Sequence, residues 1–200
     1  MSSTEELENA IKHCEVHDMP LNFSSQIDEG TSATIHNIKL RNKPAAVKLF
    51  RKQFSKKKLL LVASKLRKLQ NKNVVRFRGY SVRPCALLFQ YCFVKIESEI
   101  VHNLSQLTSI LNEKEQFNLN DRLSFILQAT KGVQYLHGNG VIHRDIKPAN
   151  LLVLEEFNNI VVKVADFDEL LSMKETINAT VTSNHMKGMT LAYTALVGLL

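Results

Sequence analysis

The sequence predicts an α+β fold built from two structural units, and three observations lead to this prediction. Short strand-like runs with one amphipathic helix fill the first part of the chain, whereas a long helical pattern dominates the remainder. The chain has 200 residues, 44% hydrophobic and 22% charged, which is ordinary for a globular protein with a sizeable core. Residues 30–96 hold seventeen Lys and Arg and no acid, between flanking stretches whose net charges are −6 and −4. This abrupt change indicates that the two units meet near residues 90–97.

The first unit is expected to contain several strands and one inserted helix. Thr4-Glu5-Glu6 is typical of the start of a short helix. Strands are expected at residues 33–40, 45–50, 74–80 and 85–91, where apolar and β-branched residues form short runs. Between the second and third strand, apolar residues recur at steps of three and four, which predicts an amphipathic helix through Leu59, Val62, Leu66 and Leu69.

The second unit is expected to begin with a long helix. Asn118, followed three residues later by Asp121, is suited to cap a helix that runs as far as Leu136. The Gly-Asn-Gly sequence at residues 138–140 should end this helix. A polar loop follows, and then two short strands are expected at residues 151–154 and 161–164.

Composition excludes several classes of protein. No apolar run approaches the ~18 residues that a membrane-spanning helix needs. The first thirty residues lack the basic start and apolar stretch of a signal peptide, so we expect a cytoplasmic protein. Three cysteines, odd in number and irregularly spaced, argue against a disulfide framework and show no zinc spacing.

Three motifs occur in a characteristic order. Residues 143–150 read HRDIKPAN, in the polar loop after the long helix, and Asp166-Phe167-Asp168 begins sixteen residues after Asn150. Upstream, Ala45-Ala46-Val47-Lys48 lies on an expected strand that follows a glycine-containing turn at residues 27–30. This arrangement resembles the protein kinase family, over about residues 21–195.

The resemblance implies a two-lobe, protein-kinase-like fold. Residues 1–20 would be an acidic lead-in, and residues 21–92 would form the N-lobe of strands plus one helix. Residues 93–200 would form a partial C-lobe that ends in the activation segment, so we expect the C-terminal helical lobe to be incomplete.

The resemblance also implies a serine/threonine protein kinase, in the style of the tyrosine-kinase-like group, that uses ATP and Mg²⁺ to phosphorylate protein hydroxyls. Asp145 would accept the proton of the substrate hydroxyl. Asn150 and Asp166 would hold the magnesium ions. Lys48 would bind the α- and β-phosphates, and Lys147 would steady the γ-phosphate. A lysine at this last position is more typical of serine/threonine kinases than of tyrosine kinases.

The remaining nucleotide-binding residues follow from the same resemblance. Phe89 matches the gatekeeper that precedes the hinge, and the backbone of the hinge would hydrogen-bond adenine. Apolar side chains would sandwich the adenine ring, and the glycine-containing turn would cover the phosphates. The residues assigned to these roles are Ile27, Gly30, Ile35, Ala46, Gln90, Cys92 and Leu152.

The sequence departs from the family pattern at functional positions. Val62 stands where an active kinase places the helix glutamate that pairs with the strand lysine. Gly30 is the only glycine left in the phosphate-covering turn, and Asp168 replaces the glycine of the metal-binding tripeptide. We hypothesise that Asp168 or Glu29 supplies a substitute partner for Lys48. These departures keep two alternatives open: a pseudokinase scaffold, with or without nucleotide, and an inactive kinase fragment.

The basic stretch at residues 30–96 is compatible with an anionic partner, such as RNA, anionic lipid or an acidic protein. RNA is not expected, because the aromatic pattern of RNA-binding sheets is missing. We therefore expect a protein substrate and ATP as partners, together with an acidic partner on the basic N-lobe. Within the chain itself, Glu5, Glu6 and Glu8 are candidates to dock on this surface.

Overall fold

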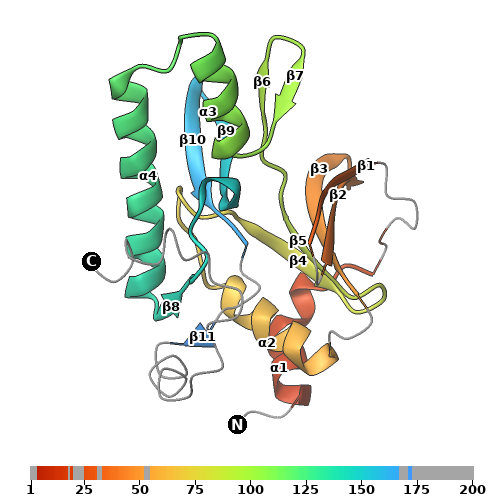
Figure 1. Cartoon of the computed structure of the whole chain (residues 1–200). Helices are drawn as coiled ribbons and strands as arrows, with labels where there is room; N and C mark the ends of the chain where they lie inside the picture. Colours follow the sequence, from red (N-terminus) through yellow and green to blue (C-terminus); the bar gives the residue numbers. More distant parts are fainter. Residues whose placement is uncertain are drawn as a thin grey trace. The chain divides into compact units, whose positions relative to one another are not determined.

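The computed structural model of the chain describes residues 4–17, 19, 25–30, 33–51, 55–166 and 171–172 (Figure 1). It divides into two compact units. The first comprises Met1–Gln70 and Arg76–Tyr91, and the second comprises Asn71–Val75 and Cys92–Leu200. Among the described residues, no helix is both long enough and apolar enough to cross a membrane. The α+β class predicted from the sequence is confirmed.

A five-stranded antiparallel sheet forms the body of the first unit, with the strand order β1-β2-β3-β5-β4. Its strands are β1 (Ser25–Glu29), β2 (Ala33–Leu40), β3 (Lys43–Phe50), β4 (Phe77–Ser81) and β5 (Ala86–Gln90). The strands expected at residues 33–40, 45–50 and 85–91 are confirmed. The turn expected at residues 27–30 is wrong, because Ile27 to Glu29 belong to β1, in which Asp28 and Glu29 pair with β2.

The turn between β2 and β3 fixes the register of this sheet. Arg41 and Asn42 have φ of 48° and 63°, so both central residues of the two-residue loop are left-handed, as a type I′ hairpin requires. Leu40 therefore pairs with Lys43, and further along the hairpin Ile35 pairs with Lys48. This register decides which face of the sheet receives the Lys48 side chain.

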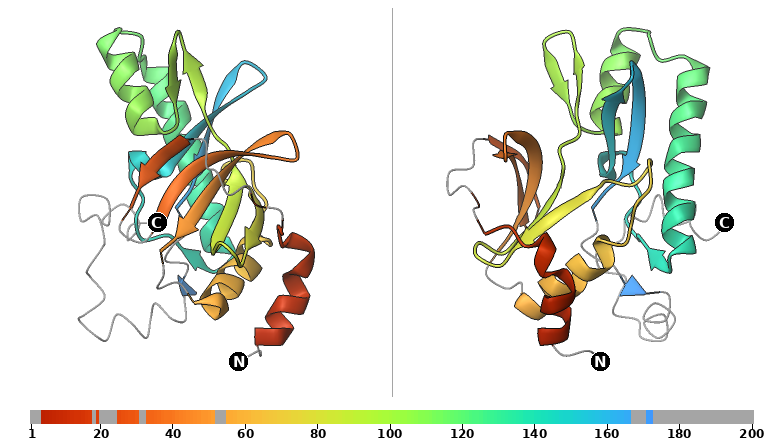
Figure 2. Two further views of the ribbon diagram at one scale, coloured as in Figure 1. Left: turned by 90° about the vertical axis from the view of Figure 1, so that its right-hand side faces the viewer. Right: turned by 180° about the vertical axis from the view of Figure 1, so that it is seen from behind.

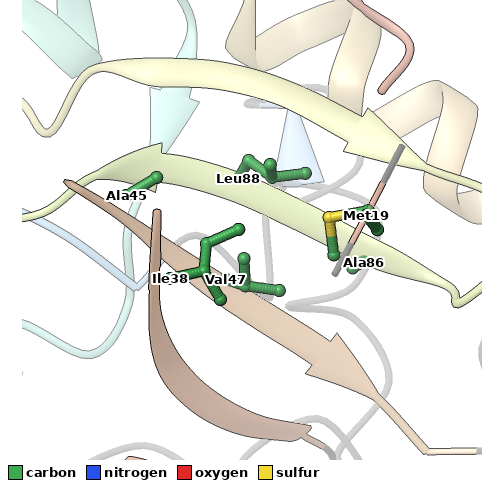
Figure 3. Close-up of a cluster of buried hydrophobic side chains, with 6 residues drawn as sticks. All are labelled: Met19, Ile38, Ala45, Val47, Ala86 and Leu88. Atoms are coloured by element: carbon green, nitrogen blue, oxygen red, sulfur yellow. The ribbon is translucent and has the colours of Figure 1, made fainter. Parts of the chain in front are cut away.

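Buried apolar side chains cover one face of the sheet, as Figure 3 shows. They come from β2, β3 and β5, whose alternate residues point to the same side. Met19, which precedes the strands in the chain, packs into the same cluster. The members of the cluster are Met19, Ile38, Ala45, Val47, Ala86 and Leu88.

Helix α2 (Lys56–Leu66) is the helix predicted from the apolar periodicity. Its N-terminus is capped by Ser55, whose side chain accepts a hydrogen bond of 3.2 Å from the Lys58 amide. The helix packs on β4 and β5 with an apolar stripe and leaves its lysines in solvent. The buried residues of the stripe are Leu59, Leu60, Val62, Ala63 and Leu66.

The N-terminal residues are folded as well. Helix α1 (Thr4–Ile11), which the sequence predicts, continues into the 3₁₀ turn η1 (Lys12–Cys14). Helix α1 lies beside α2, as Figure 2 shows. Thus the acidic lead-in contributes a helix to the first unit.

Helix α4 (Leu119–Gly138), with 20 residues, is the longest helix in the described part of the second unit. Its expected cap is confirmed, because Asn118 Oδ1 accepts a hydrogen bond of 3.0 Å from the Asp121 amide. The helix ends at the Gly-Asn-Gly sequence, also as expected. Before it come a hairpin of β6 (Val94–Ile96) and β7 (Glu99–Val101) and the helix α3 (Leu104–Glu113), which the sequence patterns did not predict.

The hairpin of β9 (Leu151–Glu156) and β10 (Asn159–Val164) confirms the last two expected strands. Figure 1 shows α4 beside β10 and α3 beside β9. Strand β8 (Val141–Ile142) follows α4 and pairs with β11 (Leu171–Ser172), and the turn η2 (Pro148–Asn150) leads into β9.

The strand expected at residues 74–80 begins later, because its first residues serve the second unit. Val74 forms a bridge with Val164, and the Val75 amide donates a hydrogen bond of 2.9 Å to the Val164 carbonyl. Strand β4 starts only at Phe77. The apolar run at residues 74–80 is therefore divided between the two units. The local sequence pattern could not show this, because the partner of Val74 and Val75 is the distant Val164.

Helix α4 leaves an apolar stripe exposed in the described part of the chain. The stripe repeats at helical spacing and consists of Leu119, Leu123, Ile126 and Leu127, each more than half exposed. The helix packs on β10, and its buried residues are Phe125, Gly132, Val133 and Leu136.

Candidate active site

The loop at residues 143–150 gathers three of the expected catalytic residues. The Asp145 carboxylate contacts two donors through Oδ2: Lys147 Nζ at 2.8 Å and Asn150 Nδ2 at 2.9 Å. Asn150 Nδ2 also donates to the Asp145 carbonyl at 2.8 Å. Asn150 is nearly buried, at 8% exposed. The ammonium group and the side-chain amide together fix the position of the Asp145 carboxylate.

His143 anchors the start of this loop from inside the fold. Its Nε2 donates to the Ala165 carbonyl, and its Nδ1 accepts a hydrogen bond of 3.3 Å from the Asp145 amide. These two contacts define a neutral ring with its proton on Nε2. Burial lowers the pKa of His143 below its ordinary value, although the Ala165 carbonyl and the carboxylates of Asp166 and Asp145 oppose that effect.

Asp166 lies next to this network at the end of β10. The Ala165 amide donates a hydrogen bond of 2.9 Å to the Asn150 carbonyl, so the backbone brings the position after Ala165 beside Asn150. Asp166 has a φ of 71°, and its side chain is exposed. Few residues other than glycine adopt such a backbone, although aspartate does so more readily than most. Leu152 lies on the neighbouring strand, where it pairs with Lys163.

The outer edge of β10 is held by side chains instead of by a further strand. Gln128, on α4, accepts a hydrogen bond of 3.0 Å from the Val162 amide and donates one of 3.2 Å to the Ile160 carbonyl. Asn73 donates through Nδ2 to the Val162 carbonyl at 2.9 Å. These amides satisfy edge groups that would otherwise be open.

The backbone of residues 71–75 continues this edge toward Asp166. The Val164 amide donates to the Asn73 carbonyl at 2.9 Å. Helix α4 approaches that carbonyl so closely that a Cβ built on Gly132 would lie 2.4 Å from it. Buried Lys163 donates to the Lys72 carbonyl at 2.8 Å and pairs with Glu156 at 3.3 Å. We infer that these contacts position the end of β10, and with it Asp166.

Within the first unit, the expected nucleotide-binding residues share one face of the sheet. Lys48 pairs with Ile35 on β2, and Ala46 pairs with Phe89 on β5. Because side chains alternate along a strand, these four project to the same side. Lys48 is only 9% exposed. Phe89 makes an edge-to-face contact with Phe77, with ring centroids 6.0 Å apart.

The other expected contact residues of the first part of the chain lie in β1, directly after it, or at the end of β5 and just beyond it. The Gly30 amide donates to the Ala33 carbonyl at 2.9 Å, and Ile27 lies on β1. At the hinge, the Gln90 amide donates to the Arg76 carbonyl at 2.8 Å. The Cys92 carbonyl is 3.1 Å from His102 Nδ1. Cys92 itself is buried.

The structure bears directly on one departure from the kinase pattern. Val62 lies on α2 and is 6% exposed, and α2 carries no acidic residue. The Glu29 carboxylate contacts the Arg51 guanidinium, and it accepts a hydrogen bond of 3.2 Å from the side-chain Nε2 of Gln26. Asp168, the other suggested partner of Lys48, lies outside the described residues together with Phe167.

The expected site residues therefore form two groups. Asp145, Lys147 and Asn150 are in direct contact in the second unit, with Asp166 adjacent through the backbone. Ile35, Ala46, Lys48 and Phe89 share the sheet face of the first unit. Sequence patterns missed the roles of Gln128 and Gly132. Gly132 stands in the middle of a segment that otherwise favours a helix, and this glycine is the local feature that indicates close packing.

Comparisons with known proteins support a common origin for these features. The family model of the protein kinase domain matches residues 21–195. A probable serine/threonine-protein kinase of Dictyostelium discoideum is 27% identical over 181 residues, which cover 89% of this chain and 11% of that protein. Serine/threonine-protein kinase STY46 of Arabidopsis thaliana is 31% identical over 162 residues, which cover 76% of this chain and 26% of that protein.

Human calcium/calmodulin-dependent protein kinase type IV is 27% identical over 145 residues, which cover 72% of this chain and 29% of that protein. The chain thus spans less than a third of the length of each of these relatives. Because the family model matches most of the chain and the expected motifs lie within the match, this chain belongs to the protein kinase domain family.

Proposed function

We propose that this chain is the core of a serine/threonine protein kinase that transfers the γ-phosphoryl group of ATP to a protein hydroxyl. The observation that carries the proposal is the contact network of Asp145 with Lys147 and Asn150. Phosphoryl transfer requires little more than positioning and neutralisation of charge, and this network provides a fixed proton acceptor beside a cation.

Asp145 would act on the substrate hydroxyl. Two donors converge on its Oδ2 and fix the orientation of the carboxylate, which would accept the hydroxyl proton as the bond to phosphorus forms. Lys147 would place its ammonium group next to the transferring phosphoryl group, where negative charge is concentrated. Its contact with Asp145 keeps the acceptor and the cation at a fixed separation.

The donor chemistry of the second unit fits a magnesium ion. Mg²⁺ prefers oxygen ligands, and it neutralises phosphate charge when it is bound. Asn150 uses its Nδ2 on Asp145, so its Oδ1, which accepts no hydrogen bond from the described residues, would be the ligand atom. Asp166 would supply a carboxylate oxygen.

The first unit would hold the nucleotide itself. Lys48, nearly buried on its sheet face, would bind the α- and β-phosphates, and Ile35 and Ala46 would pack against the adenine ring. Within the protein, the Gln90 amide donates to the Arg76 carbonyl, and the Cys92 carbonyl lies 3.1 Å from His102 Nδ1. By resemblance to the kinase family, we propose the Gln90 carbonyl and the Cys92 amide as the adenine contacts.

A second candidate function is a nucleotide-binding scaffold without phosphoryl transfer. The observation in its favour is Val62, which leaves α2 without an acid to pair with Lys48. A strand lysine that no helix glutamate positions orients phosphates less well, so a chain of this kind would retain ATP yet transfer its phosphoryl group slowly or not at all.

A titration of the purified chain with ATP and Mg²⁺ tests the proposal. At 100 times the dissociation constant, binding stabilises the folded state by about 2.7 kcal/mol, which is readily seen as a thermal shift. Lys48→Ala and Asp166→Ala should abolish the shift, whereas Lys131→Ala, at an exposed position of α4, should keep it.

Phosphoryl transfer to a generic substrate protein separates the two candidates. Transfer by the wild type that Asp145→Asn abolishes identifies the kinase. A thermal shift without transfer identifies the scaffold. No shift in the wild type refutes both.

A further inference from the structure

Residues 4–17 and Met19, which we call the N-terminal brace, precede the region that matches the kinase family, yet they are built into the first unit. Helix α1 packs on α2, as Figure 2 shows. Ile11, at the end of α1, is fully buried. The Glu8 carboxylate meets Lys56 Nζ at 2.9 Å through both of its oxygens. Helix packing thus joins the brace to α2, and an ion pair joins it to the first residue of that helix, Lys56.

The brace next pairs with the edge of the sheet. The Val16 amide donates a hydrogen bond of 2.8 Å to the Tyr80 carbonyl, and Glu15 and Tyr80 form a parallel bridge. Beside them, the Cys14 carbonyl approaches Gly79 so closely that a Cβ there would lie 2.6 Å from it. Strand β4 is the last strand of the sheet, so the brace covers an edge that would otherwise be open.

The end of the brace reaches the core of the unit. Met19 belongs to the cluster that Figure 3 shows, together with residues of β2, β3 and β5. The brace therefore touches the unit at α2, at the β4 edge and on the sheet face of this cluster. Three attachments to different elements restrict how those elements can move relative to one another.

One cross-strand row connects the brace to Lys48. Glu15 is bridged to Tyr80, Tyr80 pairs with Leu87, and Leu87 pairs with Lys48. Tyr80 is fully buried, and Leu87 nearly so. Burial raises the pKa of Tyr80 to about 12, and the nearby Glu15 and Glu8 carboxylates add to the rise. Paired residues in such a row are neighbours, so a displacement at the edge is passed inward by direct contact.

Helix α2 has no acid of its own with which to pair with Lys48. We infer that the N-terminal brace takes over the role of a pair between a helix glutamate and Lys48. It holds α2 and the cross-strand row that ends at Lys48 in place, with Glu8 and Ile11 as positioning residues. The part of this inference that concerns nucleotide rests on the proposed function. The part that concerns α2 does not.

Amide hydrogen exchange of the full chain tests the inference. Ile11→Ala truncates a buried side chain of α1, the helix that packs on α2, and we expect exchange of the α2 amides to rise at least tenfold while the β2–β3 turn keeps its rate. Ile11→Val should retain protection, and Glu5→Gln, at an exposed position of the same helix, should match the wild type. Unchanged exchange in α2, or an equal rise throughout the first unit, would overturn the inference.

A charge exchange provides a variant that disturbs no buried side chain. Glu8→Lys places two cations together, so α2 exchange should rise severalfold, and adding Lys56→Glu should restore it. If the double variant exchanges as fast as Glu8→Lys alone, the pair does not position α2 and the inference fails. Rescue is a result that a general loss of stability would not produce.

The affinity for ATP and Mg²⁺, measured on the same variants, tests whether the brace also positions Lys48. Ile11→Ala should bind at least fivefold more weakly than Ile11→Val. If the two variants bind ATP and Mg²⁺ equally well although the α2 amides exchange faster in Ile11→Ala, the proposed link between the brace and Lys48 is refuted. If the wild type binds no nucleotide while α2 protection still depends on Ile11, the brace is supported and the proposed function is refuted.

Discussion

Replacing Gly132 with alanine should destabilise the second unit, although alanine is the better helix former. Gly132 lies within α4, where this exchange alone favours folding by about 1 kcal/mol. The added Cβ, however, would lie 2.4 Å from the Asn73 carbonyl oxygen and 2.7 Å from Val164 Cγ2. Ordinary contact begins at 3.4 Å, so the backbone at Asn73 would have to retreat by about 1 Å.

The magnitude follows from what that retreat disturbs. Overpacking against a well-packed site costs about 1–3 kcal/mol. The Asn73 carbonyl also accepts the hydrogen bond from Val164, and weakening it costs about 1 kcal/mol. After the gain in helix propensity is subtracted, we expect a net loss of about 1–3 kcal/mol in the free energy of unfolding.

Urea unfolding measures this loss, with Gly138→Ala as the matched control. Gly138 belongs to the same helix, and a Cβ there would have no atom within 4 Å. With a slope of about 2 kcal/mol per molar urea, Gly132→Ala should lower the midpoint by about 0.5–1.5 M. Gly138→Ala should leave it unchanged or raise it slightly. If both variants raise the midpoint, the close approach of α4 to residues 71–75 is refuted.

Three further predictions concern the second unit. Lys163→Met should cost about 1–3 kcal/mol in urea unfolding, because it removes the hydrogen bond from a charged donor to the Lys72 carbonyl, whereas Lys131→Met at an exposed position should be neutral. Stability should fall as pH drops below the unfolded pKa of His143, by at most about 1.4 kcal/mol per pH unit, because the unfolded state then binds a proton that the folded state rejects. His143→Gln should flatten this dependence and His13→Gln should not, so equal slopes would contradict the buried neutral ring. Leu123→Glu should change the free energy of unfolding by less than about 0.5 kcal/mol while reducing self-association in light scattering, and a large loss of stability would show that the side chain is covered.

Elements with strong local signals could be predicted from the sequence. Helix α4 begins at its expected asparagine cap and ends at the expected glycines, because caps and stops depend on neighbours in the chain. Strand β2 has the expected bounds of residues 33–40, since its apolar residues are grouped and a tight turn follows it. The loop at residues 143–150 was identified by its motif, and its internal contacts are short-range.

Elements that depend on distant partners could not be predicted. Helix α3 contains serine, threonine and asparagine and buries only Leu107, so its local pattern is weak. Strand β1 has Ile27 as its single apolar residue and owes its conformation to pairing with β2. The amides of Gln128 and Asn73 meet β10 across 34 and 89 residues of sequence, and neither carries a local sign of that role.

The division of the chain at residues 71–75 has a consequence for the order of folding. This short segment belongs to the second unit, although chain on both sides of it belongs to the first. Its partner, Val164, is synthesised some ninety residues later, so the contact must close a very long loop. The sheet of the first unit is complete once residue 90 has emerged from the ribosome. We therefore expect the first unit to fold early. Residues 71–75 would gain their partner only later, when the β9–β10 hairpin has been synthesised and folded.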